Sequence, residues 1–305
     1  MDFRKLIKEH PTILMEGALS QRLQREYGIC LDEQIDLAGL VYDPQARKAL
    51  KTLWEQYRTI AEKYSLPFIA TTPTRRANRE RIGRSVFDED LFQKNVDFLR
   101  SIQQESQVEM AVGALMGCRG DAYTGEGALT EEEAFSFHAW TIENFKKAEV
   151  DFLYAAIMPT LPEALGLARA ADISGLPVII SFTIQKNGKL IDGTKICDAI
   201  QEIDSKTKNQ PVFYMTNCVH PTIVYQALSH PFNQTKQVKE RFLGIQANTS
   251  PLSFAQLDHS ADLKSSDPDV FAQQMLRLRE VANIHIWGGC CGTDQRHMEA
   301  LARNL

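Results

Sequence analysis

The sequence lacks the features that define several classes of protein. It contains no run of about 18 apolar residues, the length that a membrane-spanning helix needs. Its start, MDFRKLIKEHPTILMEG, interrupts every apolar stretch with charge, so we expect no signal peptide and a cytoplasmic location. Lys and Arg number 34 against 39 Asp and Glu, with no basic block, so we expect neither a nucleic-acid partner nor a membrane partner. Nothing in the sequence indicates an oligomeric state.

Cysteine is scarce, and linker sequence is missing. Six cysteines among 305 residues are too few for a disulfide scaffold, and in a reducing compartment a cluster of them indicates metal binding or catalysis. No stretch rich in Pro, Gly or Ser divides the chain, so we expect a single domain over residues 1–305. The 44% of hydrophobic residues is ordinary for a globular protein and supplies a large core.

What the sequence does contain is a regular alternation of strand and helix patterns. The runs expected to form strands are 13–16, 66–72, 108–113, 152–157, 177–182, 211–216, 242–247 and 284–287. Helices are expected from Asp43-Pro44, from Asp88, from a capping box at Thr130 and Glu133, and from about Leu161, Thr194, Pro221, Asp267 and Thr293. Eight strand-then-helix units imply a parallel sheet and predict an α/β fold, a single (β/α)8 TIM barrel. A doubly wound sheet stays open as the alternative.

In such a barrel, the chemistry is carried by the loops after the strands. Cys218 follows the sixth expected strand, and Cys290 and Cys291 follow the eighth in the segment GGCCGT. Zn²⁺ takes four ligands, and a catalytic site keeps one position open, so three thiolates at the barrel mouth suit a catalytic zinc ion. Glycines on both sides of the cysteine pair let the backbone turn. Two other interpretations are a phosphate cradle in the glycine-rich loop and simple burial of the cysteines.

The remaining cysteines and the nearby histidines are weaker candidates. We expect no function for Cys30, Cys118 and Cys197, because two of them lie in or beside helical patterns. His220 and His297 lie within a few residues of the cysteine motifs but fall early in the following helices. We therefore expect them to support the site or to lie at the surface rather than to bind metal.

Several motifs together resemble one family. Glu16-Gly17 after the first strand, the Thr-x-Thr of Thr72 and Thr74, Asn217-Cys218 and GGCCGT after the last strand are similar to the homocysteine S-methyltransferase family. MPTLPEA, SFTI and DGT lie between them in the same order, so the resemblance covers essentially the whole chain. It implies a barrel in which Cys218, Cys290 and Cys291 bind zinc, and a methyl transfer to a thiol of the kind used in methionine biosynthesis. It also implies a substrate site that includes Glu16, Gly17, Thr72, Arg75 and Asn217.

Zinc suits this reaction for a physical reason. A free thiol has a pKa near ~8.5, so only about 3% is the nucleophilic thiolate at neutral pH, whereas a metal-bound thiol is deprotonated outright. The acceptor sulfur is expected to take the open position. For the donor we expect a small sulfonium compound, S-methylmethionine or S-adenosylmethionine, because the chain has no room for cobalamin or folate modules. Two alternatives remain, a zinc- or thiol-binding barrel without turnover and a barrel that binds a phosphate cofactor.

Two positions differ from the family pattern. Ala156 stands where the family usually has a glutamate that resembles an anchor for the amino group of homocysteine, and Arg75 stands where an aromatic residue is usual. The loss of one charge-assisted hydrogen bond costs roughly 1.5 to 3 kcal/mol. We therefore expect homocysteine to be a poor acceptor and a related thiol acid without the amino group to be a better one, or the methyl donor to differ. Two alternatives stay open: Arg75 points into solvent, or Glu16 alone holds the amine and homocysteine is the acceptor.

Overall fold

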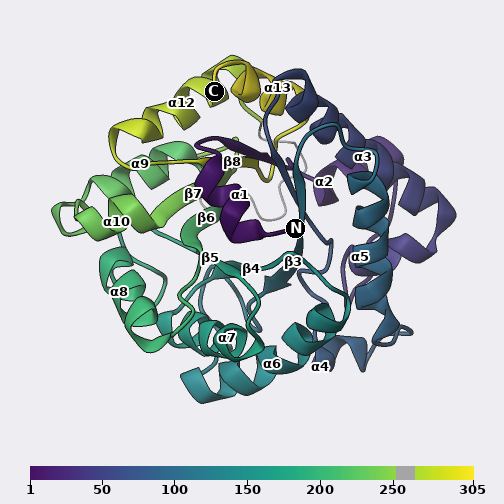
Figure 1. Cartoon of the computed structure of the whole chain (residues 1–305), viewed down its shortest axis with the longest axis horizontal. Coiled ribbons are helices and arrows are strands. Elements are labelled where there is room, and N and C mark those ends of the chain that lie inside the picture. Colours follow the sequence, from purple (N-terminus) through teal and green to yellow (C-terminus); the bar gives the residue numbers. More distant parts are fainter. Residues whose placement is uncertain (252–264) are drawn as a thin grey trace.

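The computed structural model describes residues 1–251 and 265–305, and it forms a closed barrel (Figure 1). Eight parallel strands pair in the order β1 to β8, and β1 returns to β8 with Ile13 opposite Ile286. This closure confirms the barrel and rules out the doubly wound sheet. The strands are β1 Ile13–Met15, β2 Phe68–Thr71, β3 Met110–Gly117, β4 Phe152–Met158, β5 Val178–Phe182, β6 Phe213–Val219, β7 Phe242–Ala247 and β8 Ile286–Gly289.

Helices surround the barrel as an outer ring (Figure 1). They are α2 Ser20–Tyr27, α3 Pro44–Lys63, α4 Arg79–Ile82, α5 Asp90–Gln103, α6 Glu131–Lys147, α7 Leu161–Ser174, α8 Ile196–Lys206, α9 Pro221–Ser229, α10 Lys236–Arg241, α12 Pro268–Leu276 and α13 Gln295–Arg303, with 3₁₀ turns η1 Ala38–Tyr42, η2 Pro231–Asn233 and η3 Arg277–Glu280. None of the helices in the described part of the chain is long and apolar enough to cross a membrane.

Local capping signals explain where several helices begin. Asp43 accepts a hydrogen bond from the amide of Ala46 at the start of α3, and the capping box at the start of α6 forms as predicted. Three helices begin two residues later than expected. The helix expected from Asp88 begins at Asp90, the one expected from Thr194 begins at Ile196, and the one expected from Thr293 begins at Gln295, because Asp294 is its cap.

The barrel has an apolar closed end and a polar open end. The N-terminal helix α1, Phe3–Glu9, lies across the middle of the ring in Figure 1, and Phe3 stacks on Phe152 at the start of β4 with ring centroids 4.0 Å apart. Because Phe152 begins its strand, α1 closes the N-terminal end of the barrel. Inward-facing apolar side chains fill the interior above it. Polar side chains, including Glu16, Ser181 and Asn217, are buried near the C-terminal ends of the strands.

Candidate metal centre

Three cysteines meet at the C-terminal end of the barrel. The Sγ atoms of Cys218, Cys290 and Cys291 all lie within 4.8 Å of one another, and those of Cys290 and Cys291 are 4.0 Å apart. Three sulfurs bound tetrahedrally to one zinc ion at about 2.3 Å would lie roughly 3.8 Å apart. The cluster therefore fits a single tetrahedral ion with small adjustments of the side chains.

A bulge in β6 turns Cys218 toward this cluster. Cys218 does not follow the strand, as the sequence suggested, but is its penultimate residue. Phe213 and Met215 face the barrel interior, so strict alternation would send Cys218 toward the outer helices. Instead the β6–β7 register shifts between Asn217 and Val219, and Cys218 has φ of 58°. Such a backbone costs about 1 to 3 kcal/mol, and here it brings two consecutive side chains to the mouth.

The loop that carries Cys290 and Cys291 is fixed by its own amides. Gly289 donates to the carbonyl of Glu16 at 3.1 Å, and Cys290 donates to that of Ala247 at 2.7 Å. Gly292, with φ of 85°, donates to Oε1 of Gln21 at 2.8 Å. A phosphate cradle needs amides free to point at its ligand. Because these three are already used, the structure favours the metal interpretation of this loop over the phosphate one.

The first and last loops of the barrel are packed together beside the cysteines. Oγ1 of Thr293 accepts from the amide of Ala18 at 3.0 Å, and the hydroxyl of Tyr57 donates to the carbonyl of Ala18 at 2.8 Å. A Cβ atom at Gly17 would lie 2.8 Å from the Tyr57 ring, closer than real Cβ atoms approach. The requirement for glycine at position 17 is therefore explained by this packing, and its predicted contact with substrate stays a prediction.

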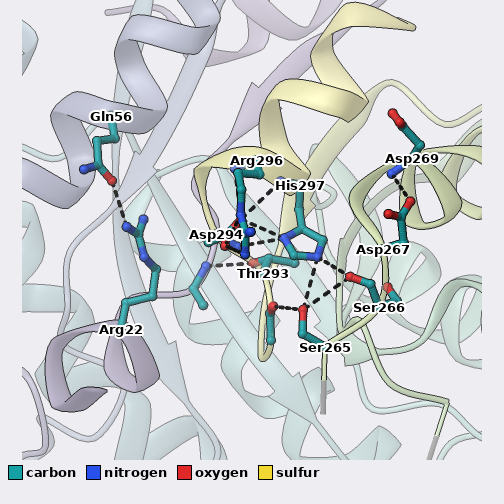
Figure 2. A network of polar contacts seen from close by, with 12 residues as sticks. Arg22, Gln56, Ser265, Ser266, Asp267, Asp269, Thr293, Asp294, Arg296 and His297 are labelled. Atoms are coloured by element: carbon teal, nitrogen blue, oxygen red, sulfur yellow. Dashed lines mark hydrogen bonds and ion pairs between the residues drawn. The ribbon is translucent and has the colours of Figure 1, made fainter. Parts of the chain in front are cut away.

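His297 and His220 have supporting positions outside the cysteine cluster. Figure 2 shows the His297 ring between Asp294, 2.8 Å from Nδ1, and the carbonyl of Ser266, 2.9 Å from Nε2. Ser265 contacts the same ring and donates to the carbonyl of Gly292 at 3.0 Å. His220 caps α9 through Thr222. Both rings hold the backbone next to the cysteines, in agreement with the expected supporting role.

The thiol groups of the cysteine cluster differ in their pKa values. Hydrogen bonding with Cys218 and Cys291, together with burial, raises the pKa of Cys290 well above its usual value. Hydrogen bonding with Cys218 and Cys290 instead lowers the pKa of Cys291 well below its usual value. Three buried thiols at this spacing repel one another once ionised, so full ionisation requires a cation among them.

Glu16 is a buried acid with one free oxygen. Its Oε1 accepts from the hydroxyl of Thr71 at 2.6 Å, whereas Oε2 has no hydrogen-bond partner among the described residues. Burial raises the pKa of Glu16 to about 7. A buried carboxylate oxygen without a partner is costly in isolation, which points to a ligand group or water at this position.

Asn217 and Thr72 have local structural partners. Oδ1 of Asn217 accepts from the amide of Ile157 at 3.0 Å and from Oγ of Ser181 at 2.6 Å, and its Nδ2 lies 3.6 Å from Sγ of Cys218. Asn217 thereby joins β4, β5 and β6 beside the cysteine. Oγ1 of Thr72 accepts from the amide of Leu115 at 3.1 Å. Substrate contact by either residue remains a prediction.

Arg75 lies at the mouth and interacts electrostatically with the cysteines. Its Nη2 donates to Oδ2 of Asp36 at 3.1 Å, and 40% of its side chain is exposed. Burial lowers the pKa of Arg75, but the charges of Asp36 and then Cys218 outweigh this and raise it overall. Arg75 is therefore paired with Asp36 and partly exposed, and its contact with substrate stays a prediction.

Sequence reasoning missed Tyr123 and the residue that holds its loop. Burial, followed by the negative charges of the three clustered cysteines, raises the pKa of Tyr123 well above its usual value, which places its ring near them. The loop after β3 that carries Tyr123 is held by Glu163, a buried residue of α7 that accepts from the amides of Arg119 at 2.7 Å and Leu129 at 3.4 Å. The only sequence signal was the position of Glu163 in MPTLPEA.

The other three cysteines lie apart from the cluster. Cys30 is exposed, and Sγ of Cys197 lies 3.2 Å from Oδ1 of Asp198 on the outer ring. Sγ of Cys118 lies 3.5 Å from the carbonyl of Gly120, and burial raises the pKa of Cys118 to about 12. None of these three cysteines belongs to the metal-compatible cluster found among the described residues.

Comparisons with known proteins agree with this architecture. The family model described as homocysteine S-methyltransferase matches residues 13–305. The metallated form of the homocysteine methyltransferase MmuM from Escherichia coli superposes with a TM-score of 0.78 at 20% identity, covering 100% of both chains. The oxidised form gives 0.76 at 20% and the apo form 0.69 at 19%, again over the whole of both chains. A search of curated proteins gave no match.

Proposed function

Because the chain belongs to the homocysteine S-methyltransferase family, it is a methyltransferase, and we propose that it methylates a small thiol at a zinc ion held by Cys218, Cys290 and Cys291. The observation that carries this proposal is the convergence of three Sγ atoms within 4.8 Å at the barrel mouth. Three protein thiolates leave one position of a tetrahedral zinc ion open, and zinc in that state holds an acceptor sulfur in its thiolate form.

We propose that the acceptor is homocysteine or a related thiol acid and that the donor is a small sulfonium compound, S-methylmethionine or S-adenosylmethionine. In the transfer, the acceptor thiolate forms a new S–C bond to the methyl group. The donor S–C bond breaks, and its electron pair stays on the donor sulfur as a neutral thioether. The thiol proton leaves to water. Alignment of the two substrates accounts for much of the rate acceleration, because it converts a bimolecular step into an effectively unimolecular one.

The protein groups around the cysteines support these steps in different ways. Asn217 fixes the end of β6 and keeps Cys218 turned inward through its contacts with β4 and β5. Glu16 offers its unpartnered Oε2 to a hydrogen-bond donor of the acceptor. Tyr123, in the β3 loop, is near enough to the cysteines for their charges to raise its pKa, and we propose that it helps to exclude water from the thiolate. Exclusion of water matters because a less hydrated thiolate is a stronger nucleophile.

The test is the metal content and the turnover of the intact protein. We expect protein purified without chelator to carry one zinc ion per chain and to form a methyl thioether when a thiol panel is incubated with each sulfonium donor, detected by mass spectrometry. Zinc-loaded protein that methylates no thiol with either donor would identify a binding barrel without turnover. Absence of stoichiometric zinc from active protein would refute the metal assignment.

A further inference from the structure

Arg75 and Ala156, the two positions that differ from the family pattern, both neighbour Gly117. Gly117 at the end of β3 pairs in register with Ala156 in β4, and both positions face the barrel interior. A Cβ atom at Gly117 would lie 3.0 Å from Cγ of Arg75 and 2.7 Å from its carbonyl oxygen. The backbone and stem of Arg75 therefore lie against Gly117, whose register partner in β4 is Ala156.

The guanidinium group of Arg75 can still bind an anion while it is paired with Asp36. Its ion pair with Asp36 is made through Nη2, one of three guanidinium nitrogens. Arginine carries five N–H donors in a planar fork that suits a carboxylate or another oxyanion. Gly117, against which Arg75 packs, is the last residue of β3, and the clustered cysteines lie at the ends of β6 and β8, so Arg75 and the cysteines belong to the same barrel mouth.

The part of the mouth around Arg75 and Ala156 offers few hydrogen-bond or ion-pair partners to a positively charged group. Ala156 is fully buried and has no polar atom in its side chain, so the wall beside Arg75 is apolar. The carboxylate of Asp36 is already paired with Arg75. Among the described residues, Glu16 keeps an unpartnered oxygen, but it follows β1 and accepts from Thr71 of β2, so it does not stand at position 156 of β4. An ammonium group placed here would meet a cation and gain no hydrogen bond from position 156.

We propose that the preferred acceptor is a thiol that bears an anionic group and no ammonium group, and that Arg75 binds the anion while the thiol reaches the cysteine cluster. This inference rests on the proposed function and specifies its substrate class. Mercaptocarboxylates and mercaptosulfonates share the required chemistry. Arg75 is then a specificity-determining residue, and Gly117 and Ala156 are the small residues that make room for it.

The test compares matched acceptors that differ in one group. Homocysteine is compared with 4-mercaptobutanoate, which lacks the amine, with 3-aminopropane-1-thiol, which lacks the carboxylate, and with neutral 3-mercaptopropan-1-ol. 3-Mercaptopropane-1-sulfonate separates a sulfonate source of the anion from a carboxylate source. We expect kcat/KM to be about tenfold or more higher for the best anionic thiol than for homocysteine, and lowest for the aminothiol.

Two substitutions localise the preference. Arg75→Gln should lower kcat/KM for the anionic thiols by about 10- to 150-fold and leave that for 3-mercaptopropan-1-ol nearly unchanged. Ala156→Glu should shift the preference toward homocysteine, provided that its zinc content stays at the unmodified level. Arg119→Gln removes a positive charge from another mouth loop, where Arg119 pairs with Glu80, and it should change none of these ratios.

Binding provides a second readout that does not depend on turnover. Calorimetry should show tighter binding of 4-(methylthio)butanoate than of methionine, and Arg75→Gln should abolish the difference. Equal or better use of homocysteine, with no effect of Arg75→Gln, would overturn this inference and leave the methyltransferase intact. Failure to methylate any thiol would overturn the proposed function, and the calorimetric comparison would still decide whether Arg75 selects anions.

Discussion

The barrel mouth has two edges that are built on different principles. At the β6–β8 edge, three sulfurs converge within 4.8 Å, and their backbones are fixed by a bulge and by amides with named partners. At the β2–β4 edge, a long, partly exposed Arg75 lies against Gly117, the register partner of Ala156. A metal ion tolerates ligand distances within about ±0.2 Å, whereas charge recognition tolerates far looser geometry. The first edge therefore resists change, and the second can change its substrate through one or two residues.

The largest effect is expected from substitutions that remove a cysteine from the β6–β8 edge. Replacing Cys218, Cys290 or Cys291 by Ser should lower zinc affinity by more than about 100-fold, beyond the cost of losing a supporting partner, and should abolish methyl transfer. Elemental analysis and a transfer assay measure both. The barrel should stay folded, since the cysteines lie at its mouth rather than in its core.

Cys197→Ser is the matched control for these variants, because Cys197 is half-buried on the outer ring. It should keep its zinc and its activity. Full zinc occupancy in any of the three cluster variants would show that the ligand set is wrong.

Glu16 contacts both edges of the mouth, and its ionisation should make the stability of the protein depend on pH. Its carbonyl accepts from Gly289, and its carboxylate accepts from Thr71. The folded-state pKa of about 7 lies above the ordinary 4.5, so the folded protein holds a proton that the unfolded chain has lost, and Glu16 costs stability as pH rises from 4.5 to 7. Relative to the unmodified protein, Glu16→Gln should gain up to about 3 kcal/mol between pH 5 and pH 8.

Urea unfolding of both proteins at the two pH values measures this difference. The metal contributes to the two proteins alike, so its own pH dependence cancels in the comparison. A pH-independent difference between the variant and the unmodified protein would mean that Glu16 stays ionised at the mouth.

Glu163 supports the β2–β4 edge through the β3 loop. The residue is fully buried, and its Oε1 lies 3.4 Å from Nε2 of His138 as well as accepting the loop amide of Arg119. Glu163→Gln removes the charge from these contacts and should cost about 1.5 to 3 kcal/mol in the free energy of unfolding. Because Tyr123 then loses its support, KM for the acceptor should rise while zinc content stays constant.

Glu132→Gln is the control for this charge change. The Glu132 side chain is 77% exposed and pairs with Arg169 at the surface, so its loss should cost about 0.5 kcal/mol or less. If Glu163→Gln lost zinc rather than acceptor affinity, the two edges would not be independent.

The smallest effect is expected from a substitution that strengthens anion binding at the β2–β4 edge. Asp36 competes with an acceptor anion for Arg75, so Asp36→Asn should lower KM for an anionic thiol by roughly two- to fivefold, the range of a partly exposed ion pair. Steady-state kinetics with 4-mercaptobutanoate measures it. Glu80→Gln, which removes the partner of Arg119, should leave KM unchanged, and an equal fall in both variants would indicate a general effect of net charge.

The fold and the cysteine cluster could be predicted because their signals are local. Each strand is a short apolar run, and the caps at Asp43 and Thr130 lie within a few residues of the amides that they bind. The motif around Cys290 and Cys291 and the barrel rule that strand ends share one mouth predicted the cluster. Helices α1 and α2 were not predicted, because they are short and α1 owes its place to packing of Phe3 on Phe152, far away in the sequence.

The sequence by itself determined the order of strands and helices, the barrel and the three candidate ligands, since periodicity, capping and motif spacing depend on neighbouring residues. Only the tertiary structure decided that a bulge turns Cys218 inward, that Tyr123 lies near the cysteines, and that Arg75 packs against Gly117. These facts depend on strand register and on loops that meet across the barrel. Residues about 40 positions apart along the chain acquire a shared chemistry only when the closed sheet places them side by side.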